Sequence, residues 1–422
     1  MTQPLDGLRV VELAEGIAGP YGGKLLADYG ADVVKVEPAG GDRSRHRGPF
    51  PTGVVDIEQS GLFLHLNTNK RSIVGAIDDD PVQRLLAAGD VAIVSNPALD
   101  LAALQAAHPD LVIVSVTSFG LTGPYAGYRG EEIVHYALGG PMSASGNPDR
   151  EPVKMGGDVG QYQCGTVAAV AALAGLATAA RRGRGVVVDL SNIETQIGTI
   201  DRRMTYLLYG SYRGENVERA GGYALSPLPG GCRPALDGHV QVSTLMNWIP
   251  RMLEVVDNPD MAAVYQSPDF LVDESVPEVL DAHLLSWTLT RARQEAMEEA
   301  QAKGWPVTAV NRPIDLLSDQ HFAERGFFVD VEHPVAGTGR QAGAPIRLDD
   351  GWALRRPAPL LDQHRAEIEA ELEAGTTPAG TAPTSAGSDS ADEESAAQAD
   401  RLPLEGVRVL DMTVVWAGPF AT

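Results

Sequence analysis

The sequence predicts an α/β protein whose large domain is built on a doubly wound parallel sheet. Runs of β-branched residues alternate with helical stretches in the first half of the chain, an order that favours a parallel sheet covered by helices on both faces. The clearest strand-like runs are residues 8–13, 32–37, 91–94, 111–116 and 185–190. Composition agrees with a globular fold, because 44% of the 422 residues are hydrophobic.

The first two strands and the helix between them form a compact βαβ unit. Residues 8–13 are apolar enough for a buried strand, and a turn of small residues follows at 14–19. Pro20 suits the first helical position and Gly30 suits a helix end, since proline lacks the N–H that is unpaired there and glycine adopts the left-handed cap. The strand at 32–37 completes the unit.

The most apolar segment, residues 165–180, consists mainly of Ala, Val, Leu, Gly and Thr. A bilayer span needs about 20 apolar residues, and this run is shorter and has smaller side chains. We therefore expect no membrane contact. The better interpretation is a buried helix ending at Arg181-Arg182-Gly183, because basic residues suit the last turn and glycine the cap.

Charge and cysteine content exclude several classes of protein. Lysine and arginine total 33 against 56 acidic residues, a formal charge of −23, so bulk attraction to nucleic acid or anionic lipid is not expected. Cys164 and Cys232 are far apart and form no metal-ligand spacing, which indicates neither a disulfide framework nor a zinc site. Residues 1–6 lack the pattern of a signal peptide, and we expect a cytoplasmic protein.

Composition also predicts where domains begin and end. Residues 1–220 form the first part of the large domain, and a glycine- and proline-rich connection opens a smaller α+β domain at 221–330. Within it we expect a helix near 289–301 and a strand at 307–310. From 374 to 400 there is no Val, Ile, Leu, Phe, Tyr or Trp. Such a segment cannot form a core, so 374–402 is expected to be a disordered, acidic linker.

The residues after this linker repeat the start of the chain. Eight of the seventeen positions from Pro403 to Pro419 are identical to those from Pro4 to Pro20, in one register without a gap. Such a repeat predicts a tandem of two similar domains. Residues 403–422 would be the truncated start of the second domain, poorly anchored by themselves.

A dinucleotide-binding motif is the main rival interpretation of the first turn. Gly16, Gly19 and Gly22 follow a strand, and Glu37 ends the next strand, as in enzymes that bind nicotinamide cofactors. The spacing is GxxGxxG rather than GxGxxG, and Pro20 removes an N–H that a phosphate would use. Close packing of a helix on its sheet explains these glycines better than an NAD-type Rossmann oxidoreductase.

Several motifs together resemble one family, the family III CoA-transferases (CaiB/BaiF). They are Ala18-Gly19-Pro20, residues 25–38, Asn69-Lys70-Arg71-Ser72, residues 118–125, 183–185 and 188–191, Arg325-Gly326, His333-Pro334 and residues 357–360. The likeness extends from Pro4 to about Leu372.

The resemblance implies a ring-like fold, in which residues 331–373 return to the large domain. Two such units interlock, as a homodimer or as two domains of one chain. It also implies a transferase that moves CoA between an acyl-CoA and a carboxylic acid, with no tightly bound cofactor. In the family an aspartate attacks the thioester and passes through mixed-anhydride and aspartyl-CoA intermediates.

The same resemblance locates the catalytic position, because the family places its aspartate four residues before the glycine that opens the alanine-rich helix. That glycine is Gly165 here, and the position is occupied by Gln161, a very poor nucleophile. Asp158, one helical turn earlier, is a substitute candidate, although a capping or turn aspartate is the simpler interpretation. A racemase of this family would need a histidine at Glu131.

Ligand binding rests on separate residues. Arg43, Arg45, Lys70 and Arg71 belong to the densest basic groups of an acidic chain and are candidates to meet the phosphates of CoA, or else are solvated loop charges. The resemblance adds Ile17 and Asn96 as residues lining the CoA cleft.

Three functions therefore stay open. We favour a degenerate, CoA-binding half of a tandem or split CoA-transferase. A competent transferase that uses Asp158 and a scaffold for a related polypeptide are the alternatives.

Overall fold

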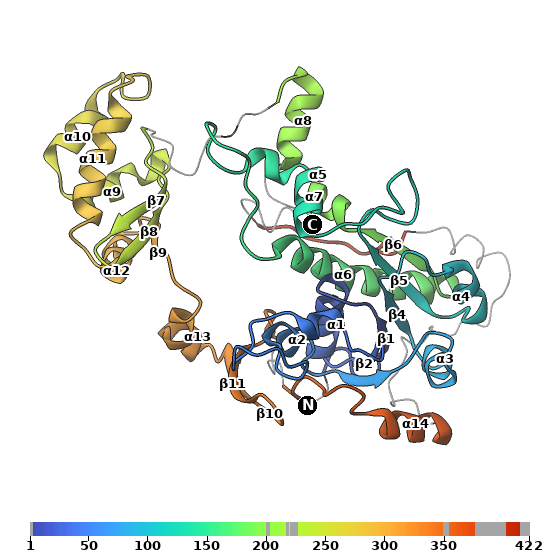
Figure 1. Cartoon of the computed structure of the whole chain (residues 1–422). Coiled ribbons are helices and arrows are strands. Elements are labelled where there is room, and N and C mark those ends of the chain that lie inside the picture. Colours follow the sequence, from blue (N-terminus) through green and yellow to red (C-terminus); the bar gives the residue numbers. More distant parts are fainter. Residues whose placement is uncertain are drawn as a thin grey trace. The chain divides into compact units, whose positions relative to one another are not determined.

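The computed structural model describes residues 3–199, 203–216, 219, 227–348, 354–375 and 402–413. It divides into two compact units (Figure 1). The first comprises Met1–Gly140, Met155–Met204 and Phe327–Thr422, and the second Pro141–Lys154 and Thr205–Gly326. The first boundary thus falls before the predicted 220/221, and a short earlier segment joins the second unit. Positions 221–226 of the predicted connection and 376–401 of the predicted linker lie outside the described residues.

A six-stranded parallel sheet of order β3-β2-β1-β4-β5-β6 forms the centre of the first unit. Its strands are β1 (Arg9–Leu13), β2 (Asp32–Glu37), β3 (Arg71–Val74), β4 (Val91–Val94), β5 (Val112–Thr117) and β6 (Val187–Ser191). The strand order reverses between β2 and β4, on either side of β1, so the sheet is doubly wound as predicted. All the strand-like runs form strands within two residues of the expected bounds, and β3 is additional.

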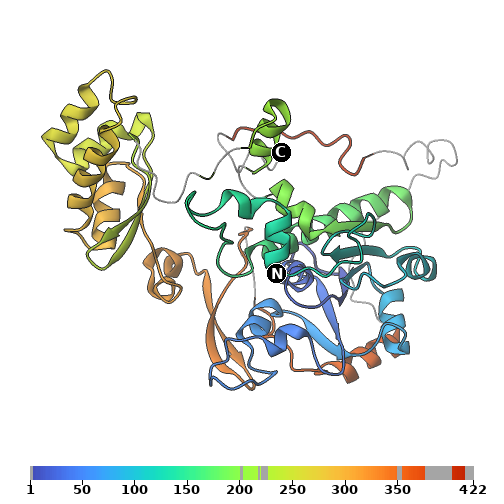
Figure 2. The same cartoon turned by 45° about the horizontal axis from the view of Figure 1, so that its top comes forward.

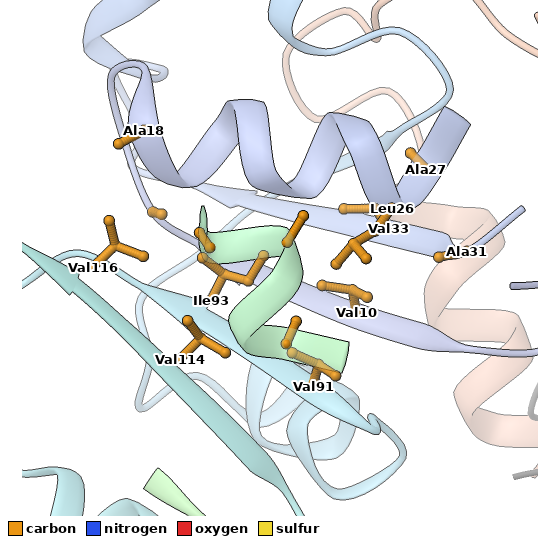
Figure 3. Close-up of a cluster of buried hydrophobic side chains, with 14 of the residues drawn as sticks. Val10, Ala18, Leu26, Ala27, Ala31, Val33, Val91, Ile93, Val114 and Val116 are labelled. Atoms are coloured by element: carbon orange, nitrogen blue, oxygen red, sulfur yellow. The ribbon is translucent and has the colours of Figure 1, made fainter. Parts of the chain in front are cut away.

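One face of the sheet is covered by α1 (Ala18–Asp28) and α6 (Val159–Arg182). Figure 3 shows Val10, Val33, Val91 and Val114 of the strands packed together with Leu26 of α1. The two helices approach closely because glycines face each other: a Cβ on Gly165 would lie 2.5 Å from the Ala18 carbonyl oxygen. Helix α1 begins two residues before the predicted Pro20, and α6 ends at Gly183 with a left-handed φ of 63°, as expected.

The other face is covered by α3 (Asp80–Ala87), α4 (Leu101–Ala107) and α14 (Arg365–Ala374), which lie opposite α6 in Figure 2. Successive strand residues point to opposite faces of the sheet, so Val11 and Ile113 pack on this face while Val10 and Val114 pack on the other. Helix α14 comes from the return segment and contributes Ile368 to this core.

The first unit also contains several short elements. They are η1 (Arg43–His46), α2 (Gly61–Leu66), α5 (Glu132–Leu138), α7 (Asn192–Thr199), and the antiparallel pair β10 (Phe328–His333) and β11 (Gly337–Ala342).

The second unit has its own core beneath the three-stranded antiparallel sheet β7-β8-β9. The strands are β7 (Gly231–Ala235), β8 (Gly238–Val242) and β9 (Val307–Ala309), and the helices are η2 (Pro141–Ala144), α8 (Arg203–Arg213), η3 (Met246–Trp248), α9 (Ile249–Val256), α10 (Pro259–Gln266), α11 (Val276–Thr288), α12 (Arg293–Ala302), η4 (Asp315–Ser318) and α13 (Gln320–Glu324). Trp287 and Trp305 meet at the centre of the core. This is the predicted α+β composition, although α12 starts four residues later than expected.

Helix α6 is long and apolar enough to cross a membrane by length and composition alone. Its inner side, however, carries Cys164, Ala168 and Ala172 into the core of the sheet. Because α6 packs into the same core as the strands, it is the buried helix that the sequence predicted. Val170 and Leu173 are exposed on its outer side.

A cluster of buried charges lies beneath the turn that follows β1. Lys35 Nζ lies 2.9 Å from Glu12 Oε1 and 2.7 Å from Asp42 Oδ2, and Lys70 Nζ lies 2.8 Å from Glu12 Oε2. All four side chains are fully buried. Asp42 Oδ1 then accepts a hydrogen bond from Gly16 N, so the cluster ties the first turn to the sheet.

Residues 402–413 of the repeated segment carry no regular helix or strand, and they are drawn in red near α6 (Figure 2). Arg181 at the end of α6 donates to the carbonyl oxygens of Leu402 and Glu405. Val409 and Leu410, which correspond to the buried Val10 and Val11 of β1, are exposed.

We predict that Lys35→Met destabilises the first unit strongly. The change leaves Glu12 and Asp42 with a buried negative charge whose main partner is gone, which costs about 3–5 kcal/mol. Urea unfolding followed by circular dichroism would measure it. The control is Arg84→Met, which removes an exposed 3.8 Å pair with Asp80 and should cost less than about 0.5 kcal/mol. Equal losses in both variants would contradict a structural role for the cluster.

Candidate active site

A pocket of about 90 Å³ opens at the carboxyl ends of the parallel strands, within the first unit. In doubly wound sheets ligands bind at this edge, beside the point where the strand order reverses. The pocket is lined by Glu15, Ala18, Gly19, Arg43, Ser95, Pro97, Val116, Thr117, Ser118, Ala126, Tyr128, Gly130, His135, Gln161 and Asn192.

Gln161 lines this pocket from the first turn of α6, so the predicted catalytic position does face the site. Its side-chain nitrogen lies 3.2 Å from His135 Nδ1, and its oxygen accepts a hydrogen bond of 3.2 Å from Asn192 Nδ2. The amide is thus held on both sides. It offers no carboxylate with which to attack an acyl carbon.

Glu132 fixes the start of α6 from α5. Its two oxygens accept hydrogen bonds from Gly160 N at 2.9 Å and Gln161 N at 3.1 Å, and the side chain is buried. A carboxylate at a helix N-terminus satisfies otherwise unpaired N–H groups and matches the helix dipole. Residue 161 is therefore presented to the pocket by a rigid helix end.

His135 lies on the same helix as Glu132 and is 2% exposed. Burial lowers the pKa of its imidazole from 6.5 to about 4, so the ring is neutral at pH 7. At position 131, where a racemase of this family would need a histidine, the chain has a largely exposed glutamate.

Arg43 is the cation of the pocket, and it lies where the first turn and η1 meet. Gly16 has a left-handed φ of 86°, which favours glycine, and a Cβ there would come within 2.7 Å of Arg43 Nε. The guanidinium is 62% exposed and reaches Glu131 only at 3.9 Å. Of the four residues predicted to bind the phosphates of CoA, Arg43 is the one that remains available to an anionic group in the pocket.

Arg45, Lys70 and Arg71 are not placed for phosphate binding, which corrects the expectation from their density in the sequence. Arg45 and Lys70 are fully buried, Arg45 in a bidentate pair with Glu37 and Lys70 against Glu12. Arg71 is 4% exposed at its side chain and pairs with Asp32 at 2.6 Å and Glu371 at 2.7 Å. Their positive charges are neutralised inside the fold, so no phosphate is needed to balance them.

Asp158 stands at the N-cap position of α6, although its side chain makes no capping hydrogen bond. It lies outside the described residues that line the pocket. Its Oδ2 forms an ion pair of 2.8 Å with Arg47. A carboxylate engaged by a guanidinium one turn away from the pocket is a poor replacement for residue 161.

Ile17 and Asn96 adjoin the pocket without belonging to its described lining. Ile17 is buried directly before Ala18. Asn96 stands between Ser95 and Pro97, and its side chain accepts a hydrogen bond from Ala98 N, so it shapes a turn.

Sequence reasoning missed several lining residues, notably Glu15, Ser95, Ser118, His135 and Asn192. Four of the five had a usable signal, because Glu15, Ser95, Ser118 and Asn192 follow predicted strands within two residues. Such positions collect at one sheet edge. His135 had no such signal, since it comes from a helix.

Comparison with known proteins decides the family. The model of CoA-transferase family III matches residues 5–365. The chain belongs to this family. Among curated relatives, succinyl-CoA:mesaconate CoA-transferase of Haloarcula hispanica is 32% identical over 395 residues, covering 88% of this chain and 97% of the relative. Succinate–glutarate CoA-transferase of Agrobacterium fabrum is 30% identical, covering 88% and 96%. The family uses CoA thioesters as substrates, as predicted.

Solved structures agree on the fold. A CaiB/BaiF family protein from Brucella suis superposes with a TM-score of 0.76 at 29% identity, covering 88% of this chain and all of that one. Rv3272 of Mycobacterium tuberculosis gives a TM-score of 0.68 at 21% identity. The predicted CaiB/BaiF-like fold is thereby confirmed.

We predict that His135 makes the fold sensitive to acid. The folded protein keeps the ring neutral down to about pH 4, whereas the unfolded chain binds a proton below about 6.5, so stability is lost as pH falls between these values. Urea unfolding at about pH 7 and about pH 4.5 should show a smaller loss for His135→Phe than for the unchanged protein. His321→Phe, at an exposed histidine, is the control. Identical losses of stability in all three proteins would refute the assignment of this acid sensitivity to His135.

Proposed function

We propose that this chain is the CoA-thioester-binding, non-nucleophilic half of a family III CoA-transferase. The carrying observation is Gln161, which stands at the family's aspartate position and lines the pocket as a neutral amide held by two neighbours. An amide cannot form the mixed anhydride, so the chemistry would come from a companion domain. Arg43 supports anion binding at the rim.

We propose that the ligand is a CoA thioester of a short-chain acid. Support comes from relatives named for succinyl-CoA or succinate together with mesaconate or glutarate, including the human succinyl-CoA:glutarate CoA-transferase at 26% identity. Succinyl-CoA is therefore the first ligand to test.

The companion is proposed to be a second CoA-transferase domain, interlocked with this one in the cytoplasm. The repeat at 403–419 favours a tandem arrangement. A homodimer would supply the same pair of domains. Ile133, Leu138, Val170 and Leu173 are exposed apolar side chains of α5 and α6 that such a partner would cover.

We predict that succinyl-CoA labels the protein only after Gln161→Asp. A carboxylate at this position attacks the thioester carbonyl, releases CoA thiolate and leaves an acyl anhydride, which hydroxylamine traps. Mass spectrometry with peptide mapping of residues 155–165 should find the trapped aspartate in the variant and no adduct in the unchanged chain.

The matched control is Asp158→Asn, which should behave like the unchanged protein. Reversible CoA binding by all three proteins, measured by calorimetry, is the accompanying expectation. A trapped adduct at Asp158 in the unchanged chain would show instead a competent transferase, and absence of CoA binding would favour a scaffold.

A further inference from the structure

The turn at the start of the repeated segment has the same backbone geometry as the turn at the start of the chain. In the first copy Asp6 N donates to Gln3 O at 3.1 Å, and in the second Glu405 N donates to Leu402 O at 3.0 Å. The glycine that follows has a φ of 89° in both copies. Residues 402–407, which we name the entry turn, thus adopt the conformation with which the first copy enters β1.

Arg181, in the last turn of α6, holds the entry turn by its backbone. One Nη atom of the guanidinium donates to the Leu402 carbonyl oxygen at 3.0 Å, and the other donates to that of Glu405 at 2.9 Å. A planar guanidinium suits two acceptors at a fixed spacing, whereas a lysine ammonium is a single point charge. In an extended chain two carbonyls three residues apart lie about 10 Å from each other. The contact therefore selects the folded turn.

The carbonyl groups that Arg181 binds are ones that a complete domain leaves uncovered. In the first copy Leu5 N donates to Tyr29 O at the end of α1, and the Leu5 side chain packs against the core. Among the described residues, the carbonyl oxygens of Gln3 and Asp6, the counterparts of the two acceptors, receive no hydrogen bond from outside the turn. Binding by Arg181 is thus compatible with a second domain that completes its own core.

The contact also lies on the outer face of α6. Residues that follow one another at helical spacing share a face, so Val170, Ala174 and Arg181 form one stripe. Val170 and Ala174 are exposed. Figure 1 and Figure 2 both draw residues 402–413 next to this helix. The entry turn therefore sits at one end of a helix face that is open to a partner.

We propose that Arg181 anchors the start of the companion domain on the end of α6. It holds the entry turn through backbone carbonyls while Leu404 and Val407, the counterparts of Leu5 and Leu8, stay exposed for that domain's own core. This inference rests on the proposed function for the nature of the partner, a second copy of this fold that continues from the entry turn. The contact itself requires no CoA.

Millisecond hydrogen exchange of the full chain, read by mass spectrometry, tests the anchor. Arg181→Met should speed exchange in the entry turn about 3- to 10-fold, the value of one hydrogen bond, because the turn loses its support. Arg181→Lys should restore part of the protection. The matched control is Arg184→Met, which removes a nearby exposed cation and should leave exchange unchanged. Residues 3–8 are the internal reference, since a misfolded variant would lose protection there too.

Photo-cross-linking measures where the segment lies. Benzoylphenylalanine in place of Ala174 should cross-link to residues 402–413, whereas the same group in place of Glu369 on α14 should not. Unchanged exchange in Arg181→Met, an equal effect of Arg184→Met, or no cross-link from position 174 would each overturn the inference. If calorimetry finds no CoA binding while exchange and cross-linking behave as expected, the proposed function fails and the anchor stands.

Discussion

The pocket depends on the buried charges under the β1–α1 turn. Glu12, Lys35, Asp42 and Lys70 are removed from water, and each charge is tolerated only because an opposite one lies within 3 Å. Through Asp42 the cluster holds the backbone of Gly16, and with it the place where Arg43 enters the pocket. A buried hydrogen bond thereby ties this loop of small residues to the charge cluster of the sheet.

On this rigid base a single side chain sets the chemical character of the site. The α6 helix end, anchored by Glu132, presents residue 161 to the pocket. With an amide there, the position donates a hydrogen bond to His135, where a carboxylate would accept one. The pocket is thus shaped and polar, although residue 161 is an amide.

Sequence reasoning succeeded where the signal is local and failed where partners are distant in the chain. Strands such as 32–37 and 91–94 follow from runs of β-branched residues, and Gly183 marks the end of α6. Lys70 looked like a surface cation because its partner Glu12 is 58 residues away. His135 was not recognised as a site residue, since its neighbours Phe119, which follows β5, and Gln161 of α6 are brought to it only by folding.

The repeated segment has a physical consequence of its own. In the first unit β1 lies between two neighbours and buries apolar side chains on both faces. Its copy inherits that two-sided character, so in residues 402–413 Leu404, Val407, Val409 and Leu410 all meet solvent. A sequence suited to the middle of a sheet is self-complementary when left open. Because the exposed segments of two molecules can associate, the solubility of this chain should fall as its concentration rises.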